Sequence, residues 1–332
     1  MSNLKNILLN KKLPCKSVWF MRQAGRYLPE FRKIRSENPD FIKLCLNSEL
    51  SSEITLQPIK RFDIDSAIIF SDILMIPYAL GQEVKFIKDE GPKLDKFDIK
   101  TFLNNDKKFT QKLSPVYKAI EITRKKLNKE KSLISFIGAP WTLLIYMLNI
   151  KDDLNINKAK LNNFDLNEIF NKLIEYSCIH IKNQINSGAD VVQIFDSWAG
   201  LIPSDNLNEY CFIPNNKIVE FCKKNKIPSI CFPKGIKKKY KEFNEFVQPD
   251  GINLDAEIEP SWAKKNLKNV VIQGGLSPST LLKSEKEITT SATKYIETFK
   301  DIPYVFNLGH GLLPQTDPDK VDKLIKFYRN FK

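Results

Sequence analysis

Short apolar runs, each long enough for a buried strand, recur along the chain with helical patterns between them. Eight such runs lie at residues 18–21, 67–70, 133–137, 191–195, 229–232, 251–254, 270–273 and 304–307. Helical patterns lie at residues 49–61, 114–128, 166–187, 206–224 and 285–299, and a closing one at residues 319–331. Strands that alternate with helices predict parallel β/α units. Eight units in 332 residues predict an α/β fold of the (β/α)8 TIM-barrel type.

Nothing in the sequence divides the chain, so we expect a single barrel domain over residues 1–332. No Gly/Ser-rich or Pro-rich linker is present, and such stretches usually mark domain boundaries. The Lys-rich patch at residues 234–241 follows a strand pattern, and we expect it to open a helix. The best candidate for an insertion is residues 83–106, with a short strand of its own near residues 84–87.

The net charge of +13 first suggests a nucleic-acid partner. The lysines, however, are spread along the whole chain, and no segment interleaves basic and aromatic residues as a base-stacking surface would. We therefore expect no nucleic-acid partner. The positive charge reflects either a compositional bias or an electric field that attracts a polyanionic substrate.

The uncharged residues 132–150 are long enough for a membrane span. Because Gly138-Ala139-Pro140-Trp141 at their centre indicates a strand, a turn and a helix start, we expect no membrane contact.

Cysteine and histidine usage indicates a cytoplasmic protein without a metal. The six cysteines form no C-x-x-C pair and are scattered as reduced thiols usually are. Residues 1–12 lack the length and the cleavage site of a signal peptide. With only two histidines and no metal-ligand spacing, zinc is not expected. The sequence also lacks a G-x-G-x-x-G loop, which would indicate a bound nucleotide, so we expect no cofactor.

In a barrel of this type, function lies where the strands end, because the βα loops build the active-site face. The polar residues that follow the predicted strands there are Arg22 and Arg26, Asp72, Tyr146, Ser197 and His310. Arginine is scarce in this chain, with seven copies among 52 basic residues, and four of the seven lie between residues 22 and 35. A planar, permanently charged guanidinium suits a carboxylate or phosphate ligand.

Residues 18–31, VWFMRQAGRYLPEF, resemble the N-terminal signature of the uroporphyrinogen decarboxylase family. The similarity continues at residues 71–74, 141–147, 195–200 and 306–312, and extends from residue 19 to about residue 319. The resemblance implies cofactor-free decarboxylation of the four acetate side chains of uroporphyrinogen III to methyl groups. The product would be coproporphyrinogen III, an intermediate of haem biosynthesis. It also implies a homodimer.

The resemblance assigns roles to residues at the strand ends. Asp72 would accept hydrogen bonds from the pyrrole N–H groups and stabilise a cationic intermediate. Arg22 and Arg26 would bind substrate carboxylates, and one of them would help to deliver the proton. The remaining substrate-binding residues would be Gln23, Ala24, Tyr146, Ser197 and His310, with Met21, Ile68 and Phe195 as apolar walls.

Each residue also has a structural alternative. Asp72 could cap the next helix, the arginines could pair with Glu30 or Asp72, and Lys234 could be structural. We interpret His180, inside a helical pattern, as structural. At the level of function, the alternatives are a corrinoid-dependent methyltransferase on the same barrel and a basic, non-enzymatic binding module. The former should carry His/Cys zinc ligands near the late strands and lack the paired-arginine loop.

Two places depart from the family pattern. After the sixth strand we expect Gly-Leu-Asp-Trp, but the chain has Gly-Ile-Asn-Leu at residues 251–254, with an acid only at Asp255. After the seventh strand we expect Gln-Gly-Asn-x-Asp-Pro, but residues 273–278 read Gln-Gly-Gly-Leu-Ser-Pro. We expect Asn253, Gly275 and Ser277 to lie on the active-site face and to change the pocket there.

Overall fold

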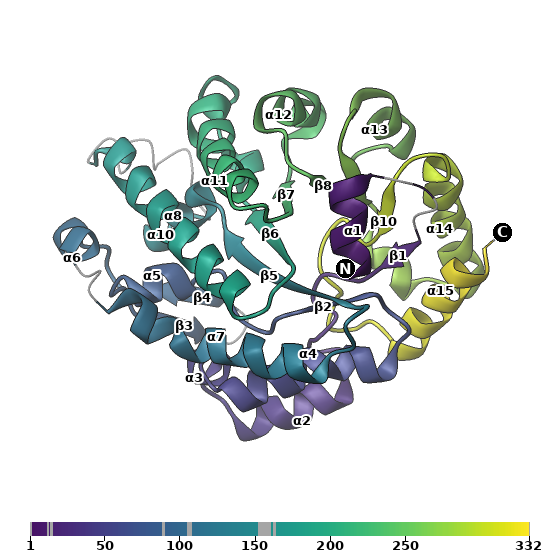
Figure 1. Ribbon diagram of the computed structural model, residues 1–332, viewed down its shortest axis with the longest axis horizontal. Helices are drawn as coiled ribbons and strands as arrows, with labels where there is room; N and C mark the ends of the chain where they lie inside the picture. Colours follow the sequence, from purple (N-terminus) through teal and green to yellow (C-terminus); the bar gives the residue numbers. More distant parts are fainter. Residues whose placement is uncertain are drawn as a thin grey trace.

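The computed structural model describes residues 2–11, 13, 16–87, 90–104, 108–151, 161 and 164–331. Within them, eight strands form one parallel sheet in the order β1-β10-β9-β8-β7-β6-β5-β2, a nearly closed barrel (Figure 1). They are β1 (Ser17–Val18), β2 (Ser66–Ile68), β5 (Ser132–Gly138), β6 (Val191–Asp196), β7 (Ser229–Pro233), β8 (Gly251–Leu254), β9 (Val271–Gly274) and β10 (Tyr304–Phe306). The predicted barrel and its eight strands are confirmed.

Helices surround the barrel (Figure 1). The outer ones are α4 (Ser48–Arg61), α7 (Phe109–Lys126), α10 (Leu166–Asn186), α11 (Ile213–Lys224), α12 (Tyr240–Val247), α13 (Pro260–Asn266), α14 (Glu285–Phe299) and α15 (Pro318–Asn330). The other helices are α1 (Asn3–Asn10), α2 (Pro29–Glu37), α3 (Phe41–Cys45), α5 (Met75–Ala79), α6 (Ile99–Asn104) and α8 (Pro140–Met147). Local signals set several starts, such as the capping box of Ser284 and Glu287 before α14. As predicted, the Lys-rich patch opens α12, and residues 132–150 form β5 and α8.

The helix predicted at residues 206–224 is continuous but begins with a wider, π-helical turn. A π-helical segment, Asn208–Phe212, precedes α11. Pro214 has no amide hydrogen to donate, and the Asn215 side chain donates its Nδ2 to the Cys211 carbonyl oxygen at 2.8 Å. The helix widens at this point, where Pro214 lacks a donor and the Asn215 side chain bonds a backbone carbonyl.

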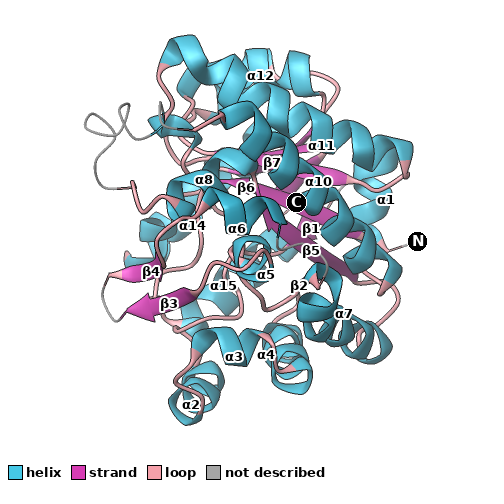
Figure 2. Ribbon diagram, turned by 90° about the vertical axis from the view of Figure 1, so that its left-hand side faces the viewer, coloured by secondary structure: helices cyan, strands magenta, loops and turns pink. Residues whose placement is uncertain are grey.

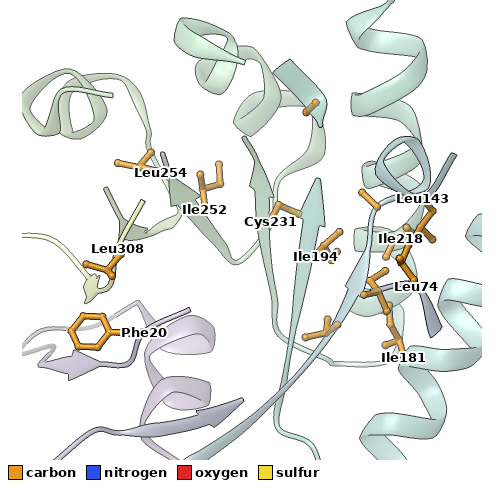
Figure 3. Close-up of a cluster of buried hydrophobic side chains, with 14 of the residues drawn as sticks. Phe20, Leu74, Leu143, Ile181, Ile194, Ile218, Cys231, Ile252, Leu254 and Leu308 are labelled. Carbon is orange, nitrogen blue, oxygen red and sulfur yellow. The ribbon is translucent and has the colours of Figure 1, made fainter. Parts of the chain in front are cut away.

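Apolar side chains fill both sides of the strands. Inside the barrel, Leu4, Ile7 and Leu8 of α1 pack with buried residues of the strands, so α1 closes the N-terminal end. Outward-facing residues of the strands pack against the helices, as Figure 3 shows for Ile194, Cys231 and Ile252 with residues such as Leu143, Ile181 and Ile218. This alternation is what a barrel strand with a filled interior requires.

The predicted insertion contains an antiparallel hairpin of β3 (Val84–Ile87) and β4 (Gly91–Leu94). The expected strand at residues 84–87 is therefore confirmed, whereas residues 88, 89, 105 and 106 lie outside the described residues. Figure 2 shows the hairpin at the opposite end of the barrel from α1, on the side where the strands end. Among the described helices, none combines the length and the apolar run needed to cross a membrane.

Side chains close the barrel between β1 and β2, where the described residues form no ladder. Asp65 Oδ2 accepts the Val18 N–H at 2.7 Å, and the Asp65 N–H donates to the Val18 carbonyl at 2.9 Å. Gln23 donates its Nε2 to the Ser66 carbonyl at 2.9 Å and accepts the Phe20 N–H at 3.0 Å. We call the junction held by Asp65 and Gln23 the seam. It also explains why β1 is shorter than predicted, because side chains take over its last hydrogen bonds.

Candidate active site

The paired arginines leave the barrel on a tight loop directly after β1. Arg22 has a left-handed backbone (φ 59°), which is uncommon outside glycine. The Leu312 N–H donates to the Met21 carbonyl at 2.9 Å, which joins this loop to the one after β10. At Gly311 there is no room for a Cβ, because it would overlap the Arg22 side chain. The first and last βα loops are therefore fitted to each other around Arg22.

Among the described residues, Arg22 and Arg26 make no ion pair. Glu30, a possible partner, instead binds Arg61 with both carboxylate oxygens, at 2.9 and 3.1 Å. Both guanidinium side chains are exposed. Desolvation by the crowded surroundings lowers the pKa of Arg22, and repulsion by Arg26 contributes in the same direction. Two close, unpaired cations favour an anionic ligand.

Asp72 lies on the loop after β2 and is half-buried. Desolvation raises the pKa of its carboxyl to about 6, although the Leu74 N–H, at 2.8 Å, and the charge of Arg22 oppose this shift. The helix that follows, α5, is capped by Leu74 and not by Asp72. The carboxylate is thus confined beside Arg22 without being neutralised by it.

Tyr146, on α8, is half-buried close to Asp72 and Arg22. Burial raises the pKa of its phenol, and the Asp72 carboxylate contributes in the same direction. The Trp198 ring meets the Tyr146 ring edge-on, with centroids 5.9 Å apart. Ser197, directly before Trp198, is half-buried as well. Helix α8, which follows β5, and the loop after β6 therefore bring a phenol and a hydroxyl to the same face.

His310 reaches this face from the loop after β10. It is half-buried, and desolvation lowers its pKa to about 4, with further contributions from the charges of Arg22 and Lys234. The imidazole is therefore neutral near pH 7 and can donate or accept a hydrogen bond. His180, by contrast, is buried between α7 and α10, where it is bonded to the Tyr117 hydroxyl at 3.0 Å.

The three predicted apolar walls lie together at the floor of this face. Met21, Ile68 and Phe195 belong to one cluster with Phe136 and Phe232. The Phe195 ring centroid lies 5.7 Å from that of Phe136 and 6.5 Å from that of Phe232. Phe136 and Phe232 were missed by sequence reasoning, although their inward positions on alternating strand residues could have revealed them.

The structure does not bring the Gln23 side chain to this face. Gln23 is buried at the seam, and its backbone N–H donates to the Phe20 carbonyl at 3.0 Å. Ala24 is half-buried beside it. Of the predicted substrate-binding residues on the loop after β1, Arg22, Ala24 and Arg26 can contact a ligand directly.

Two of the departing residues, Asn253 in β8 and Gly275 after β9, do not line the open face as expected. Asn253 is fully buried inside the barrel and accepts Gln273 Nε2 at 2.8 Å. Gln273 in turn accepts the Trp19 indole N–H at 2.9 Å. Gly275 is also buried, and a Cβ there would strike the Tyr295 ring. Ser277 is partly exposed. Asn253 and Gly275 therefore belong to the protein interior, and Gly275 has no space for a larger side chain.

Asp255 and Asp196 are buried carboxylates that sequence reasoning gave no role. Asp255 accepts the Gly235 N–H at 2.8 Å and the Tyr240 hydroxyl at 3.2 Å, which fixes the loop carrying Lys234. Asp196 ends β6 and is bonded to neighbouring helices. The described residues contain no group of three His, Cys, Asp or Glu side chains placed to hold a metal ion.

The fold and the site define a TIM-barrel enzyme whose strand-end face offers cations, one confined carboxylate and an aromatic floor. The model of the family "Uroporphyrinogen decarboxylase (URO-D)" matches residues 1–331. The uroporphyrinogen decarboxylase of Orientia tsutsugamushi (strain Boryong) is 43% identical over 321 residues, covering 95% of this chain and 94% of that protein. That of Cereibacter sphaeroides (strain ATCC 17025 / ATH 2.4.3) is 36% identical, covering 97% of each. The chain belongs to the uroporphyrinogen decarboxylase family.

A solved methyltransferase from Methanosarcina mazei has the same fold. Its TM-score is 0.82, with 99% of this chain and 98% of that chain covered at 16% identity. At that identity the likeness concerns the fold alone, and it does not favour the methyltransferase alternative.

Proposed function

We propose that this carboxy-lyase removes the four acetate carboxyl groups of uroporphyrinogen III as CO2 and leaves methyl groups, giving coproporphyrinogen III. Family membership supports the reaction, and the confined Asp72 carboxylate beside Arg22 is the observation that supports this site. The family resemblance further implies that no metal or organic cofactor takes part.

The chemistry needs an electron sink in the substrate. Protonation of a pyrrole ring carbon gives a cation conjugated with the acetate-bearing carbon. The C–CO2 bond then breaks, its electron pair neutralises the ring, and the resulting methylene carbon takes up a second proton while the ring returns its first one. Each acetate therefore consumes one proton net and releases one CO2. A fixed anion next to the cation lowers the barrier because it is already oriented before charge develops.

Asp72 suits the role of that anion. Its pKa of about 6 leaves it mostly ionised above neutral pH, so its oxygens can accept hydrogen bonds from the pyrrole N–H groups. Arg22, Arg26 and neutral His310 would hold substrate carboxylates, together with the hydroxyl groups of Tyr146 and Ser197. The aromatic floor of Phe136, Phe195 and Phe232 would support the face of the macrocycle.

The test is anaerobic incubation with uroporphyrinogen III in the presence of EDTA, followed by oxidation and chromatography of the porphyrins. Wild type and Asp72→Asn are compared. Stepwise conversion to the four-carboxylate porphyrin by wild type alone supports the reaction, metal independence and the central residue. Unchanged substrate with folded wild type would refute the activity, and equal turnover by the variant would refute the role of Asp72.

The single domain, the homodimer and the cytoplasmic location that we expect from the sequence are also proposals. The family match over residues 1–331 supports one domain. The described cysteines are free, which suits a reducing compartment. Sedimentation equilibrium should give twice the 38.4 kDa chain mass, whereas the chain mass alone would refute the dimer.

A further inference from the structure

The end of β6 holds a buried carboxylate that the proposed reaction does not use. Asp196 is fully buried and directly precedes Ser197. Its Oδ1 accepts the Thr142 hydroxyl at 2.7 Å, and its Oδ2 accepts Asn215 Nδ2 at 3.1 Å. Burial raises the pKa of Asp196 to about 6, against the effect of these hydrogen bonds. Because burying a charge costs free energy even when it is bonded, such a group beside the site suggests a positional role.

Thr142 connects this carboxylate to the loop after β6. Its buried hydroxyl donates its single proton to Asp196, so its lone pairs remain to accept the Trp198 N–H at 3.1 Å. The Trp141 indole N–H donates to the Trp198 carbonyl at 3.0 Å. Both backbone polar groups of Trp198 are therefore bonded to α8.

The same contacts hold in place two residues that we propose to bind the substrate, Ser197 and Tyr146. Within the described part of the chain, the Ser197 hydroxyl has no hydrogen bond of its own, so its place is set by its two bonded neighbours. Tyr146 follows Thr142 by one helical turn and lies on the same side of α8. It also packs edge-on against the Trp198 ring at 5.9 Å. One buried cluster thus sets the spacing between a hydroxyl on the loop after β6 and a phenol on α8.

The cluster extends to the neighbouring strand and helix. The Lys234 N–H donates to the Asp196 carbonyl at 3.1 Å, and the Gly200 N–H donates to the Lys234 carbonyl at 2.9 Å. Asn215 also bonds the Cys211 carbonyl inside the π-helical segment. Segments of this kind often occur at functional sites, and this one aims the Asn215 amide at Asp196.

We propose that Thr142, Asp196 and Asn215 form a positioning cluster that holds Ser197 and Tyr146 at the separation required by two carboxylates of the substrate. All three are buried, so they act through Ser197, Trp198 and Tyr146. The inference rests on the proposed function, because it assigns the determinants of substrate affinity at that same site.

Thr142→Val tests the cluster, because valine keeps the shape of the side chain and removes the hydroxyl. Loss of a buried hydrogen bond should lower kcat/KM for uroporphyrinogen roughly tenfold, mainly through a higher KM. Thr142→Ser, which keeps the hydroxyl, should restore most of it. Thr123→Val is the matched control. Thr123 is equally buried and bonds the Ala119 carbonyl at 2.7 Å, but it lies in α7, outside the site.

Thr123→Val should lower the melting temperature and leave kcat/KM unchanged. If wild type does not convert uroporphyrinogen, the proposed function is refuted, and the positioning role that rests on it is refuted as well. If wild type is active and folded Thr142→Val matches it, the cluster alone is refuted. An equal loss of kcat/KM in Thr123→Val would also refute it, since the effect would then be general. Should Thr142→Val not fold, Asn215→Ala must raise KM, and an unchanged KM refutes the proposal.

Discussion

At the scale of single residues, Asp72 is held where its negative charge costs the folded state free energy. Its pKa rises from 3.8 to about 6 on folding. A carboxyl with a raised pKa favours the fold most at low pH, and this contribution is lost as the pH rises through about 6. We therefore expect Asp72→Asn to raise the melting temperature at pH 7.5 and to have little effect at pH 4.

Calorimetry at the two pH values checks this expectation. Asp98→Asn is a control of opposite sign, because hydrogen bonds from Thr101 lower the pKa of Asp98. That variant should lose stability at pH 7.5. If Asp72→Asn is less stable than wild type at pH 7.5, the Asp72 carboxylate does not destabilise the folded state. The expectation that its charge is unfavourable until a ligand binds would then be wrong.

Gly311 should matter for affinity more than for stability. A Cβ at this position would overlap the flexible arm of Arg22, and the backbone of Gly311 is not in the left-handed region, so alanine brings no backbone strain. Gly311→Ala should displace the Arg22 guanidinium. If one charge-assisted hydrogen bond to the substrate is lost, KM rises about tenfold or more.

Steady-state kinetics and the melting temperature of Gly311→Ala separate the two effects. A raised KM with a melting temperature close to that of wild type is the expected result. An unchanged KM would show that the arm of Arg22 does not need this space.

Residue types and their positions after strands were enough to predict where Arg22, Asp72, Tyr146, Ser197 and His310 lie. The bonds of Asp196 could not be predicted in this way. Its partner Thr142 is 54 positions away, and their contact depends on the pairing of β5 with β6. Likewise, Asn253, near the end of the strand predicted at residues 251–254, was expected on the open face, yet it points into the barrel, where Gln273 meets it.

At the scale of secondary-structure elements, a buried histidine joins α7 to α10. His180 is 3% exposed, and burial lowers its pKa from 6.5 to about 3. As the pH falls below about 6.5, the His180 imidazole becomes protonated in the unfolded chain but stays neutral in the folded chain. The folded state therefore loses stability relative to the unfolded state. Between pH 7.5 and 5 this residue should account for a loss of roughly 2 kcal/mol.

Urea unfolding of wild type, His180→Gln and Tyr117→Phe at several pH values measures this contribution. His180→Gln should be less stable than wild type at pH 7.5, and the difference should shrink by roughly 2 kcal/mol at pH 5. Tyr117→Phe removes the hydrogen bond but keeps the imidazole, so its pH dependence should stay close to that of wild type. A constant difference between wild type and His180→Gln would show that the imidazole becomes protonated inside the fold.

The strands and outer helices could be predicted because hydrophobic periodicity is local. The exceptions have causes that are not local. The strand predicted at residues 18–21 pairs only at Ser17 and Val18, because the Gln23 and Asn307 side chains accept the next free N–H groups, those of Phe20 and Met21. The family resemblance located the Arg22 loop, but only the structure shows that the Gln23 side chain forms hydrogen bonds at the seam between β1 and β2.

At the scale of the whole molecule, the seam joins the two elements that carry the paired arginines and the central carboxylate. Asp65 accepts the Val18 N–H and lies 2.9 Å from the Arg329 guanidinium of α15. The side chains of Asp65 and Arg329 are only 15% and 22% exposed. The C-terminal helix thus stabilises the point where the barrel closes.

Asp65→Ala should lower the free energy of unfolding by roughly 2–3 kcal/mol, because it leaves the Val18 N–H without its acceptor and removes one of the two carboxylates beside the partly buried Arg329. Asp63→Ala is the control. Asp63 also lies 3.1 Å from Arg329, but its side chain is 72% exposed, so its loss should cost less than about 1 kcal/mol. Denaturant unfolding compares the two. Equal costs would mean that the ion pair alone matters. A larger cost for Asp65, accompanied by a fall in kcat/KM, would mean that closure of the barrel sets the distance between Arg22 and Asp72.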